Sequence, residues 1–315
     1  MKKEKRNIAH SILIRLSNLR RERKEEYQTI LTRFALERFL YRLQNSGYSK
    51  QFVLKGAFLF TLWTKQYYRP TKDIDFLADI SNQPEEIRRI FKEICNVEVE
   101  PDGLVYDSGN ISIEEIIEGT SHNGLRIRIL AKLQNVRIPL QFDISFGDVV
   151  YPSIKEMEYP SLLDFPKPRI RVYPLESIIS EKAEAMVDLG IQNSRMKDFY
   201  DIYSLIRSFD IEGNSMQKAI SATFERRKTG IPEDIPIALT DEFAYDKAKN
   251  EQWRQFVIKN GLSSPPETLV VVIYEIRNFL LPIFTATLKH VDFKFKWSSV
   301  STAGEIREWT NASTL

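Results

Sequence analysis

Two segments in the first half of the chain alternate between polar and apolar residues at every second position. They are Asp73-Ile74-Asp75-Phe76-Leu77 and Gln141-Phe142-Asp143-Ile144-Ser145-Phe146. A period of two is that of a β-strand, in which successive side chains point to opposite faces of the sheet. Each segment therefore predicts a strand with its apolar residues in a core and its aspartates on the other face.

The elements around these strands predict an α/β or α+β domain over residues 50–150. Apolar residues at helical spacing predict a helix from Tyr27 to Leu43, and Asn45-Ser46-Gly47 ends it. A short apolar run, Phe52–Leu54, precedes a second helix that we expect to reach about Tyr67, where Arg69-Pro70 closes it. Further expected elements are a helix at Glu85–Cys95 and strands at Val97–Glu100, Leu125–Ala131 and Pro139–Phe146.

The composition changes in the middle of the chain. Five prolines between residues 152 and 174 predict a linker, and the pattern beyond Pro174 is helical almost to Ile211. Helices are also expected around Trp253 and at Ile273–Leu281. We place a boundary near Tyr159–Val172, which predicts one domain over residues 1–160 and a mainly helical domain over residues 161–315.

Charge, cysteine content and hydropathy exclude several classes of protein. The 45 Lys and Arg residues and 43 Asp and Glu residues nearly cancel, so the chain is not a polycation. The single cysteine, Cys95, cannot form an intramolecular disulfide, and three scattered histidines cannot build a Cys/His zinc site. The N-terminal basic residues precede no apolar stretch typical of a secretory signal, and the best membrane candidate, Leu269–Tyr274, is far shorter than the roughly 20 residues that a span needs. We expect a cytoplasmic protein without a membrane segment.

Asp73, Asp75 and Asp143 are candidate metal ligands. Asp73 and Asp75 share one strand face, and two like charges so close repel each other unless a cation lies between them. Carboxylate oxygens suit Mg²⁺, which usually keeps its remaining positions for water and substrate phosphate. If the strand of Asp143 lies beside that of Asp73, three carboxylates meet at one site. The alternative is that these aspartates lie on solvated strand faces.

Gly56 and Lys182 are candidates for contacts with phosphate. A glycine between a strand and a helix lets backbone N–H groups approach an anion, although it also occurs in ordinary turns. Lys182 falls within the apolar stripe of a helix predicted at Glu176–Leu189, so it either borders a cleft or acidic partner, or extends an apolar stem to solvent. Asp198 is a possible partner of Lys182, while Asp201 could instead pair with Lys197 on a helix surface.

Basic residues gather in three short segments, at Lys2–Arg6, Arg20–Lys24 and Arg226–Lys228. The first 26 residues carry nine Lys and Arg residues against four Asp and Glu residues. Such runs are usually solvated helix faces. The alternative is that they contact the phosphate backbone of a nucleic acid.

The ordered series of these segments resembles the AbiEii/AbiGii-type nucleotidyltransferase toxins, which belong to the polymerase-β-like nucleotidyltransferase superfamily. The residues that carry the resemblance are Leu54-Lys55-Gly56-Ala57, Arg69–Phe76, Phe142–Asp148, Glu181-Lys182, Arg195–Asp201 and Phe224–Gly230. It covers roughly residues 35–260. It implies an α+β fold in which a nucleotidyltransferase domain with a mixed sheet precedes a mainly helical domain.

The resemblance also implies roles for single residues. Asp73 and Asp75 correspond to the metal-binding pair and Asp143 to a third carboxylate, whereas Lys182 and Asp198 complete the catalytic set. Lys55, Gly56, Ala57, Thr71 and Lys182 correspond to nucleotide-binding positions. Thr71 occupies a hydroxyl position that is phosphorylated in some inhibited relatives. Ala57 stands where many relatives have Gly or Ser, so a hydroxyl is missing there.

The implied activity is Mg²⁺-dependent transfer of a nucleotide from an NTP to an acceptor hydroxyl of RNA, with the 3′ end of tRNA as the expected acceptor. The implied setting is a toxin–antitoxin system in phage defence by abortive infection, with a cognate antitoxin as partner. One alternative is an NTP-binding toxin that transfers a phosphoryl or nucleotidyl group to protein. Another is a catalytically degenerate protein that binds an antitoxin.

Overall fold

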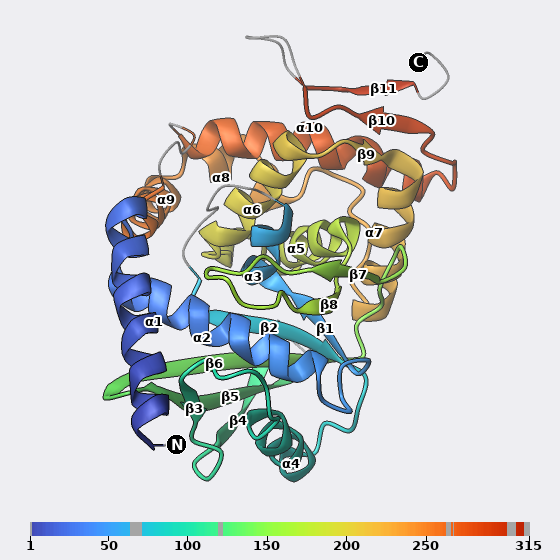
Figure 1. Cartoon of the computed structure of the whole chain (residues 1–315). Helices are drawn as coiled ribbons and strands as arrows, with labels where there is room; N and C mark the ends of the chain where they lie inside the picture. The colour runs from blue at the N-terminus through green and yellow to red at the C-terminus, as the bar shows by residue number, and fades with distance from the viewer. Residues whose placement is uncertain are drawn as a thin grey trace. The chain divides into compact units, whose positions relative to one another are not determined.

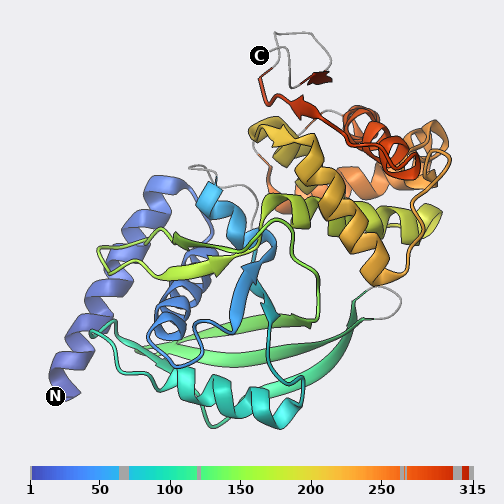
Figure 2. The same ribbon diagram turned by 90° about the vertical axis from the view of Figure 1, so that its right-hand side faces the viewer.

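The computed structural model describes residues 2–63, 71–118, 122–262, 266, 268–300 and 307–311. The chain divides into two compact units. Unit 1 comprises residues 1–147 and 154–173, and unit 2 comprises residues 148–153 and 174–315. Figures 1 and 2 show the elements of each unit.

Unit 1 is built on an eight-stranded mixed sheet with the order β3-β5-β6-β2-β1-β8-β7, while β4 also pairs with β5. The pairs β2–β6 and β1–β8 are parallel, and the other pairs are antiparallel. This confirms the expected α+β class. The strands are β1 (Phe52–Lys55), β2 (Asp73–Ala78), β3 (Leu104–Tyr106), β4 (Ser112–Glu118), β5 (His122–Leu133), β6 (Val136–Phe146), β7 (Lys155–Glu158) and β8 (Arg169–Val172).

The helices of unit 1 are α1 (Lys2–Arg23), α2 (Tyr27–Gln44), α3 (Gly56–Trp63) and α4 (Pro84–Cys95). Phe39 of α2 contacts Phe91 of α4 and Phe142 of β6, with ring centroids 5.4 and 4.4 Å away. Because Phe142 and Asp143 point to opposite faces of β6, α2 and α4 cover the face that does not carry the aspartate. The alternation thus places Asp73, Asp75 and Asp143 on the face opposite to α2 and α4, where they share the face with apolar residues such as Leu77.

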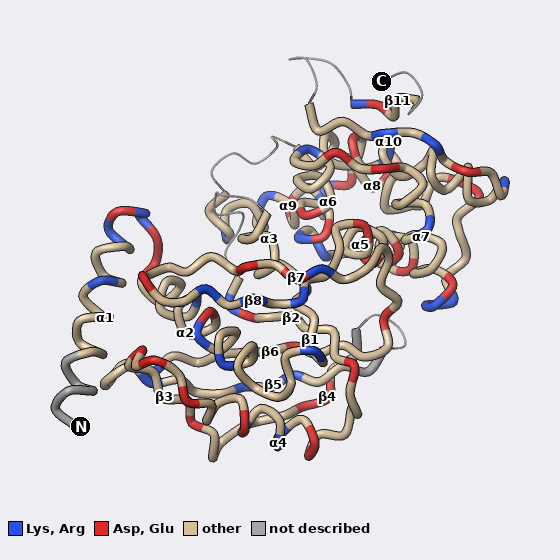
Figure 3. The backbone as a smooth tube through the Cα atoms, turned by 45° about the vertical axis from the view of Figure 1, so that its right-hand side comes forward, with Lys and Arg blue, Asp and Glu red and all other residues tan. Residues whose placement is uncertain are grey.

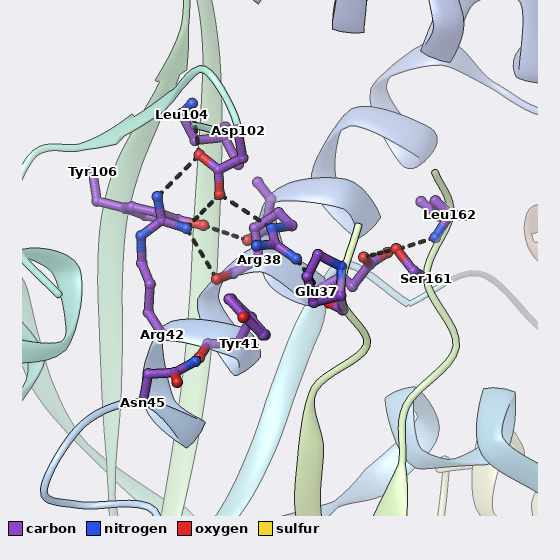
Figure 4. Close-up of polar contacts among 12 residues, drawn as sticks. Glu37, Arg38, Tyr41, Arg42, Asn45, Asp102, Leu104, Tyr106, Ser161 and Leu162 are labelled. Carbon is purple, nitrogen blue, oxygen red and sulfur yellow. Dashed lines mark hydrogen bonds and ion pairs between the residues drawn. The ribbon is translucent and has the colours of Figure 1, made fainter. Parts of the chain in front are cut away.

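A buried polar network fixes two loops against α2 (Figure 4). Arg38 and Arg42 both donate to the carboxylate of Asp102, which precedes β3. Glu37 accepts hydrogen bonds from the hydroxyl of Ser161 and the backbone N–H of Leu162, in the β7–β8 loop. Burial raises the pKa of Glu37 to about 7, although both hydrogen bonds and the nearby arginines act in the opposite direction.

The structure corrects two expectations about strands. Val97–Glu100 is irregular, and the strand forms instead at β3, because Val97 still donates to the end of α4 and β3 pairs with Ala131–Leu133 of β5. The proline-rich segment is no simple linker, since it contains the hairpin of β7 and β8. Its prolines all lie outside the two strands, where the missing N–H costs no ladder hydrogen bond.

The hairpin also determines where the units divide. We expected a boundary near Tyr159–Val172 and divided the domains at residue 160, whereas the units divide after Tyr173, because β8 pairs with β1 and the N–H of Tyr173 donates to Leu54. The expected end of the second helix near Tyr67 and its stop at Arg69-Pro70 lie outside the described residues. The described part of that helix ends at Trp63.

Unit 2 is mainly helical, as the sequence predicts. Its α-helices are α5 (Leu175–Leu189), α6 (Met196–Ser208), α7 (Gly213–Arg227), α8 (Asp241–Tyr245), α9 (Lys247–Asn260) and α10 (Leu269–Leu288). The short 3-10 helices η1 (Gly190–Gln192) and η2 (Ile237–Leu239) lie between them, and β9 (Ile211–Glu212), β10 (Phe295–Trp297) and β11 (Trp309–Asn311) form a small sheet.

Helix α10 is the core helix of unit 2. Of the helices within the described residues, it alone has the length and composition of a membrane span, and half of that stretch is buried inside the protein. Glu275 ends the apolar run Leu269–Tyr274 but not the helix, which spans 20 residues and includes the expected helical segment Ile273–Leu281. Glu275 accepts a hydrogen bond from Arg207 of α6 at 2.5 Å, so this charge is paired within unit 2.

Candidate active site

Asp73 and Asp75 lie on one face of β2. Both side chains are half-buried, while Ile74 and Phe76 between and after them are buried in the core. The Oγ1 atom of Thr71 donates a hydrogen bond to Oδ1 of Asp73 at 2.6 Å. The strand alternation therefore produces the pair of carboxylates that the sequence predicted, and Thr71 lies in contact with it.

Gly56 lies directly against Asp75. Its φ of +66° is in the left-handed region, and a Cβ added there would lie 1.7 Å from Oδ2 of Asp75. No other residue type fits without displacing the carboxylate. Gly56 is also the first residue of α3, so the start of a helix, where N–H groups lack helical partners, adjoins the carboxylate.

The neighbours of Gly56 are largely buried. Lys55 is almost fully buried, and its Nζ atom donates to Oγ of Ser145 at 3.3 Å and lies 4.6 Å from the ring centroid of Tyr173. Ala57 is buried in the first turn of α3. These contacts hold the turn between β1 and α3 in place. Any nucleotide binding by Lys55 and Ala57 would depend on the position of this turn.

Asp143 lies in a row of four charged residues that crosses four neighbouring strands. Arg126 of β5 is the register partner of Asp143, Asp143 is that of Asp75, and Asp75 is that of Lys55. We call Arg126, Asp143, Asp75 and Lys55 the charged row (Figure 1 shows the strands). Two adjacent carboxylates are thus flanked on either side by a cation.

Arg126 binds Asp143 through both carboxylate oxygens. Its Nε donates to Oδ1 at 2.8 Å and its Nη2 to Oδ2 at 2.7 Å. The side chain of Asp143 is 9% exposed and that of Arg126 30% exposed. The bond to Asp143 raises the pKa of Arg126 above its ordinary value, against a smaller opposite effect of burial. This is the bidentate geometry of strong arginine–carboxylate pairs.

The donor set fits a Mg²⁺ ion held by two carboxylates. Asp73 and Asp75 supply hard oxygen ligands on one face, beside a turn and helix start that suit phosphate. Within the described ranges, no group of three or more His, Cys, Asp or Glu residues is arranged to hold a metal ion. Two protein carboxylates suffice for Mg²⁺ when phosphate and water supply the other ligands.

Lys182 lies at the centre of a buried cluster in unit 2. Its Nζ atom lies 2.5 Å from Oδ1 of Asp198 and 3.0 Å from Oδ2 of Asp201. Both aspartates are fully buried, and the side chain of Lys182 is 14% exposed. Nε of Arg195 lies 2.6 Å from Oδ2 of Asp198. The structure thus brings Lys182 and Asp198 together, and Asp201 joins the cluster.

Electrostatics keep the carboxylate of Asp198 ionised. Burial by itself would raise the pKa of Asp198, but the charges of Lys182, Arg195 and Lys197 outweigh it and lower the pKa to about 2. A carboxylate in this state holds the lysine ammonium by charge and hydrogen bond together. Lys182 and its partners therefore form one charged assembly on α5 and α6.

Sequence reasoning did not single out Arg126 and Arg195. Arg126 belongs to an alternating strand, which places it on a polar face, but its partner depends on the register between β5 and β6. Arg195 immediately precedes α6 and begins the Arg195–Asp201 segment that carries the resemblance, but no role was assigned to it. The Arg126 contact depends on strand register, whereas the Arg195 contact is local, three residues before Asp198.

The basic segments differ in their surroundings. Arg226 and Lys228 are exposed, whereas Arg227 donates to Glu184 at 2.7 Å and lies 3.7 Å from Glu181. Arg227 is therefore a structural partner of α5 and no part of an open basic face. Residues 20–24 are exposed and lie at the C-terminal end of α1. Figure 3 shows basic and acidic residues together at that end of the helix. The side chains of Lys2–Arg6 lie outside the described part.

Three comparisons with known proteins bear on this arrangement. The sequence model of the family described as "Nucleotidyl transferase AbiEii toxin, Type IV TA system" matches residues 38–280. No curated protein matches the chain. Two crystal structures are similar at 15% identity: a candidate nucleotidyltransferase from H. pylori (TM-score 0.41, covering 82% of this chain and 96% of that one) and JHP933 from Helicobacter pylori (TM-score 0.40, 82% and 94%).

Proposed function

The chain belongs to the AbiEii family of nucleotidyltransferase toxins of type IV toxin–antitoxin systems, and from this premise we propose that it transfers a nucleotide from an NTP to an RNA hydroxyl with Mg²⁺. The acceptor in this proposal is the 3′ end of tRNA. The oxygen of the hydroxyl forms a bond to the α-phosphorus, the bond to the β-phosphate breaks, pyrophosphate leaves, and the hydroxyl proton is released to water. The family also implies a cognate antitoxin.

The observation that carries the proposal is the contact between Gly56 and Asp75. It joins a carboxylate pair to a turn and helix start that accept phosphate, because only a glycine leaves room for the Asp75 oxygen. In the proposed site, Asp73 and Asp75 hold the ion. When bound, Mg²⁺ would stabilise negative charge on the attacking and leaving oxygens.

The remaining candidate residues bind phosphate or position other residues in this proposal. Backbone N–H groups at Gly56 and Ala57 bind phosphate in this proposal, and Lys55 supports their turn from its buried position. Thr71 orients Asp73 through its hydrogen bond. The resemblance gives Lys182 a contact with the nucleotide and Asp198 the task of orienting Lys182, which their short ion pair supports.

The test is incubation of the protein with each α-labelled NTP, Mg²⁺ and total RNA. We expect label on RNA, in the tRNA fraction, and none with Asp73→Asn or Asp75→Asn. Label on protein would support transfer to protein instead, and absence of label with every NTP would support a degenerate site. Full activity of either variant at saturating Mg²⁺ would refute the metal assignment.

RNA binding has a separate test. Arg226→Gln with Lys228→Gln should lower the dependence of RNA affinity on salt, because each phosphate contact contributes a slope of about −0.7 on a logarithmic scale for single strands. NTP affinity should not change. If the slope stays the same, the exposed pair is a solvated face and does not contact RNA.

A further inference from the structure

The bidentate pair of Arg126 and Asp143 has a consequence for the proposed metal site. Asp143 is the register neighbour of Asp75, so it is the carboxylate best placed to join Asp73 and Asp75 around an ion. Yet its two oxygens already accept hydrogen bonds from Nε and Nη2 of Arg126 at 2.8 and 2.7 Å. A metal ion bound to these oxygens would have to share them with Arg126, whose positive charge repels a cation and which already occupies two of the roughly four acceptor positions of the carboxylate.

The neighbours of the pair strengthen this competition. Nε2 of Gln141 lies 3.3 and 3.4 Å from the two Asp143 oxygens, on the side of the strand that Arg126 also faces. The carboxylate of Asp143 is largely removed from water, which makes a charge-assisted contact to it harder to replace. A cation that displaced Arg126 would also leave the guanidinium with weaker acidic partners, which are Glu114, 4.0 Å from Nη1, and the charge of Asp73.

We propose that Arg126 is a positioning residue that keeps Asp143 from binding the metal ion, so that Asp73 and Asp75 alone hold it. The guanidinium supplies at the third carboxylate the positive charge that a metal would otherwise supply. This inference rests on the proposed function, since it assumes that a divalent ion binds Asp73 and Asp75. It also gives Asp143 the role of an anchor for Arg126.

The proposal predicts that the effects of two substitutions depend on each other. Asp143→Asn should change Mn²⁺ affinity less than twofold in the natural chain, because Asp143 is not a ligand there. Arg126→Met should raise Mn²⁺ affinity about tenfold, a size typical of residues that act through metal ligands, because Asp143 becomes available. In Arg126→Met, the added Asp143→Asn should then remove the whole gain.

Mn²⁺ binding to the full chain, measured by titration with a spectroscopic readout and no NTP, tests this directly. Arg128→Met is the matched control, because Arg128 lies two residues along the same strand and pairs at 2.8 Å with the exposed Glu114. It removes the same charge from the same face without releasing Asp143. We expect it to change Mn²⁺ affinity far less than Arg126→Met does.

Folding of the variants is followed by thermal unfolding, since Arg126→Met leaves Asp143 as a buried unpaired carboxylate. Arg126→Lys, which keeps the charge but cannot donate two parallel bonds, should fold and give an intermediate gain. If Arg126→Met does not fold, the Mn²⁺ affinities of Arg126→Lys and Asp143→Asn are compared instead.

Three results would overturn the proposal: a loss of Mn²⁺ affinity in Asp143→Asn as large as in Asp73→Asn, equal gains in the Arg126 and Arg128 variants, or altered stability of the Arg126 variants with unchanged Mn²⁺ affinity. Failure of the proposed function looks different. In that case Asp73→Asn and Asp75→Asn bind Mn²⁺ as the natural chain does.

Discussion

The two carboxylates of β2 in unit 1 and the two that surround Lys182 in unit 2 differ in their access to water. Asp73 and Asp75 are half-buried on one face of β2, whereas Asp198 and Asp201 are fully buried around Lys182. A half-exposed carboxylate retains hydration and can exchange water for a metal or a phosphate-bound ion. A buried carboxylate depends on its fixed cation, because an unpaired charge in the interior is strongly destabilising.

Aspartates therefore have different roles in the two places. Asp73 and Asp75 should matter for activity and little for folding. In unit 2 the aspartates and Lys182 should matter for both. Glu37 adds a third case, a buried carboxylate whose direct hydrogen bonds come from the neutral Ser161 and Leu162.

The largest effect is expected from Lys182→Met. It leaves two buried aspartates without their shared ammonium, and we expect the free energy of unfolding to fall by about 3–5 kcal/mol. Chemical unfolding of the full chain, followed by tryptophan fluorescence, measures it. Lys182→Arg keeps the charge and should lose less. Equal stability of Lys182→Met and the natural chain would mean that the lysine only extends an apolar stem to solvent.

Glu37→Gln should abolish a loss of stability that occurs as pH rises. The folded protein holds the Glu37 proton up to about pH 7, above the ordinary pKa of 4.5, so folded molecules bind more protons than unfolded ones between these values. Stability that is present below pH 4.5 is therefore lost as pH rises through about 7. The variant should gain on the order of 3 kcal/mol at pH 8 and nothing at pH 4.5.

Unfolding curves at pH 4.5 and pH 8 for both proteins measure this difference. Asp198 gives a pH dependence of stability of the opposite sign. Its pKa is lowered from 3.8 to about 2, so its contribution to stability is lost only as pH falls through about 2. A gain for Glu37→Gln that is the same at both pH values would contradict the assigned pKa.

Gly56→Ala tests whether the candidate site needs the space that Gly56 leaves beside the carboxylate of Asp75. The added methyl group would meet Asp75 and the backbone would keep a strained positive φ, so we expect a loss of about 2 kcal/mol together with loss of nucleotide transfer. Gly47→Ala is the control, since a Cβ at Gly47 would meet nothing within 4 Å. Thermal unfolding and the labelling assay give both readouts. Similar behaviour of the two variants would exclude a special role for Gly56.

The smallest effect on stability is expected from Asp73→Asn. The amide oxygen can still accept the hydrogen bond of Thr71, and removal of one charge relieves repulsion between neighbouring carboxylates. Stability should change by no more than about 0.5 kcal/mol, while nucleotide transfer is lost. Thermal unfolding beside the activity assay measures both. A loss of several kcal/mol would place Asp73 with the structural aspartates of unit 2.

Local patterns in the sequence were sufficient for much of the fold. The alternation at residues 73–77 and 141–146 determined two strands, their buried faces and the faces that carry Asp73, Asp75 and Asp143. Helical spacing determined α2 and α5 nearly to their ends. These properties depend on side-chain period, which neighbouring residues set without help from the rest of the chain.

Other features depended on pairing between distant segments. Val97–Glu100 has a strand pattern but no partner strand, whereas Leu104–Tyr106 finds one on β5. The prolines at 152–174 suggested a linker, but β8 between them pairs with β1. A strand requires hydrogen bonds from another segment. The residues of a segment can therefore allow a strand, but they cannot determine by themselves that one forms.

The candidate site shows the same division. The sequence by itself determined that Asp73 and Asp75 share a face and that Gly56 precedes a helix. Only the tertiary structure decided that the Asp75 oxygen lies against Gly56, that Arg126 binds Asp143, and that Lys182 lies between Asp198 and Asp201. The physical reason is that a side chain's face follows from its own strand or helix, whereas its charged partner follows from strand register and helix packing, which many distant residues set together.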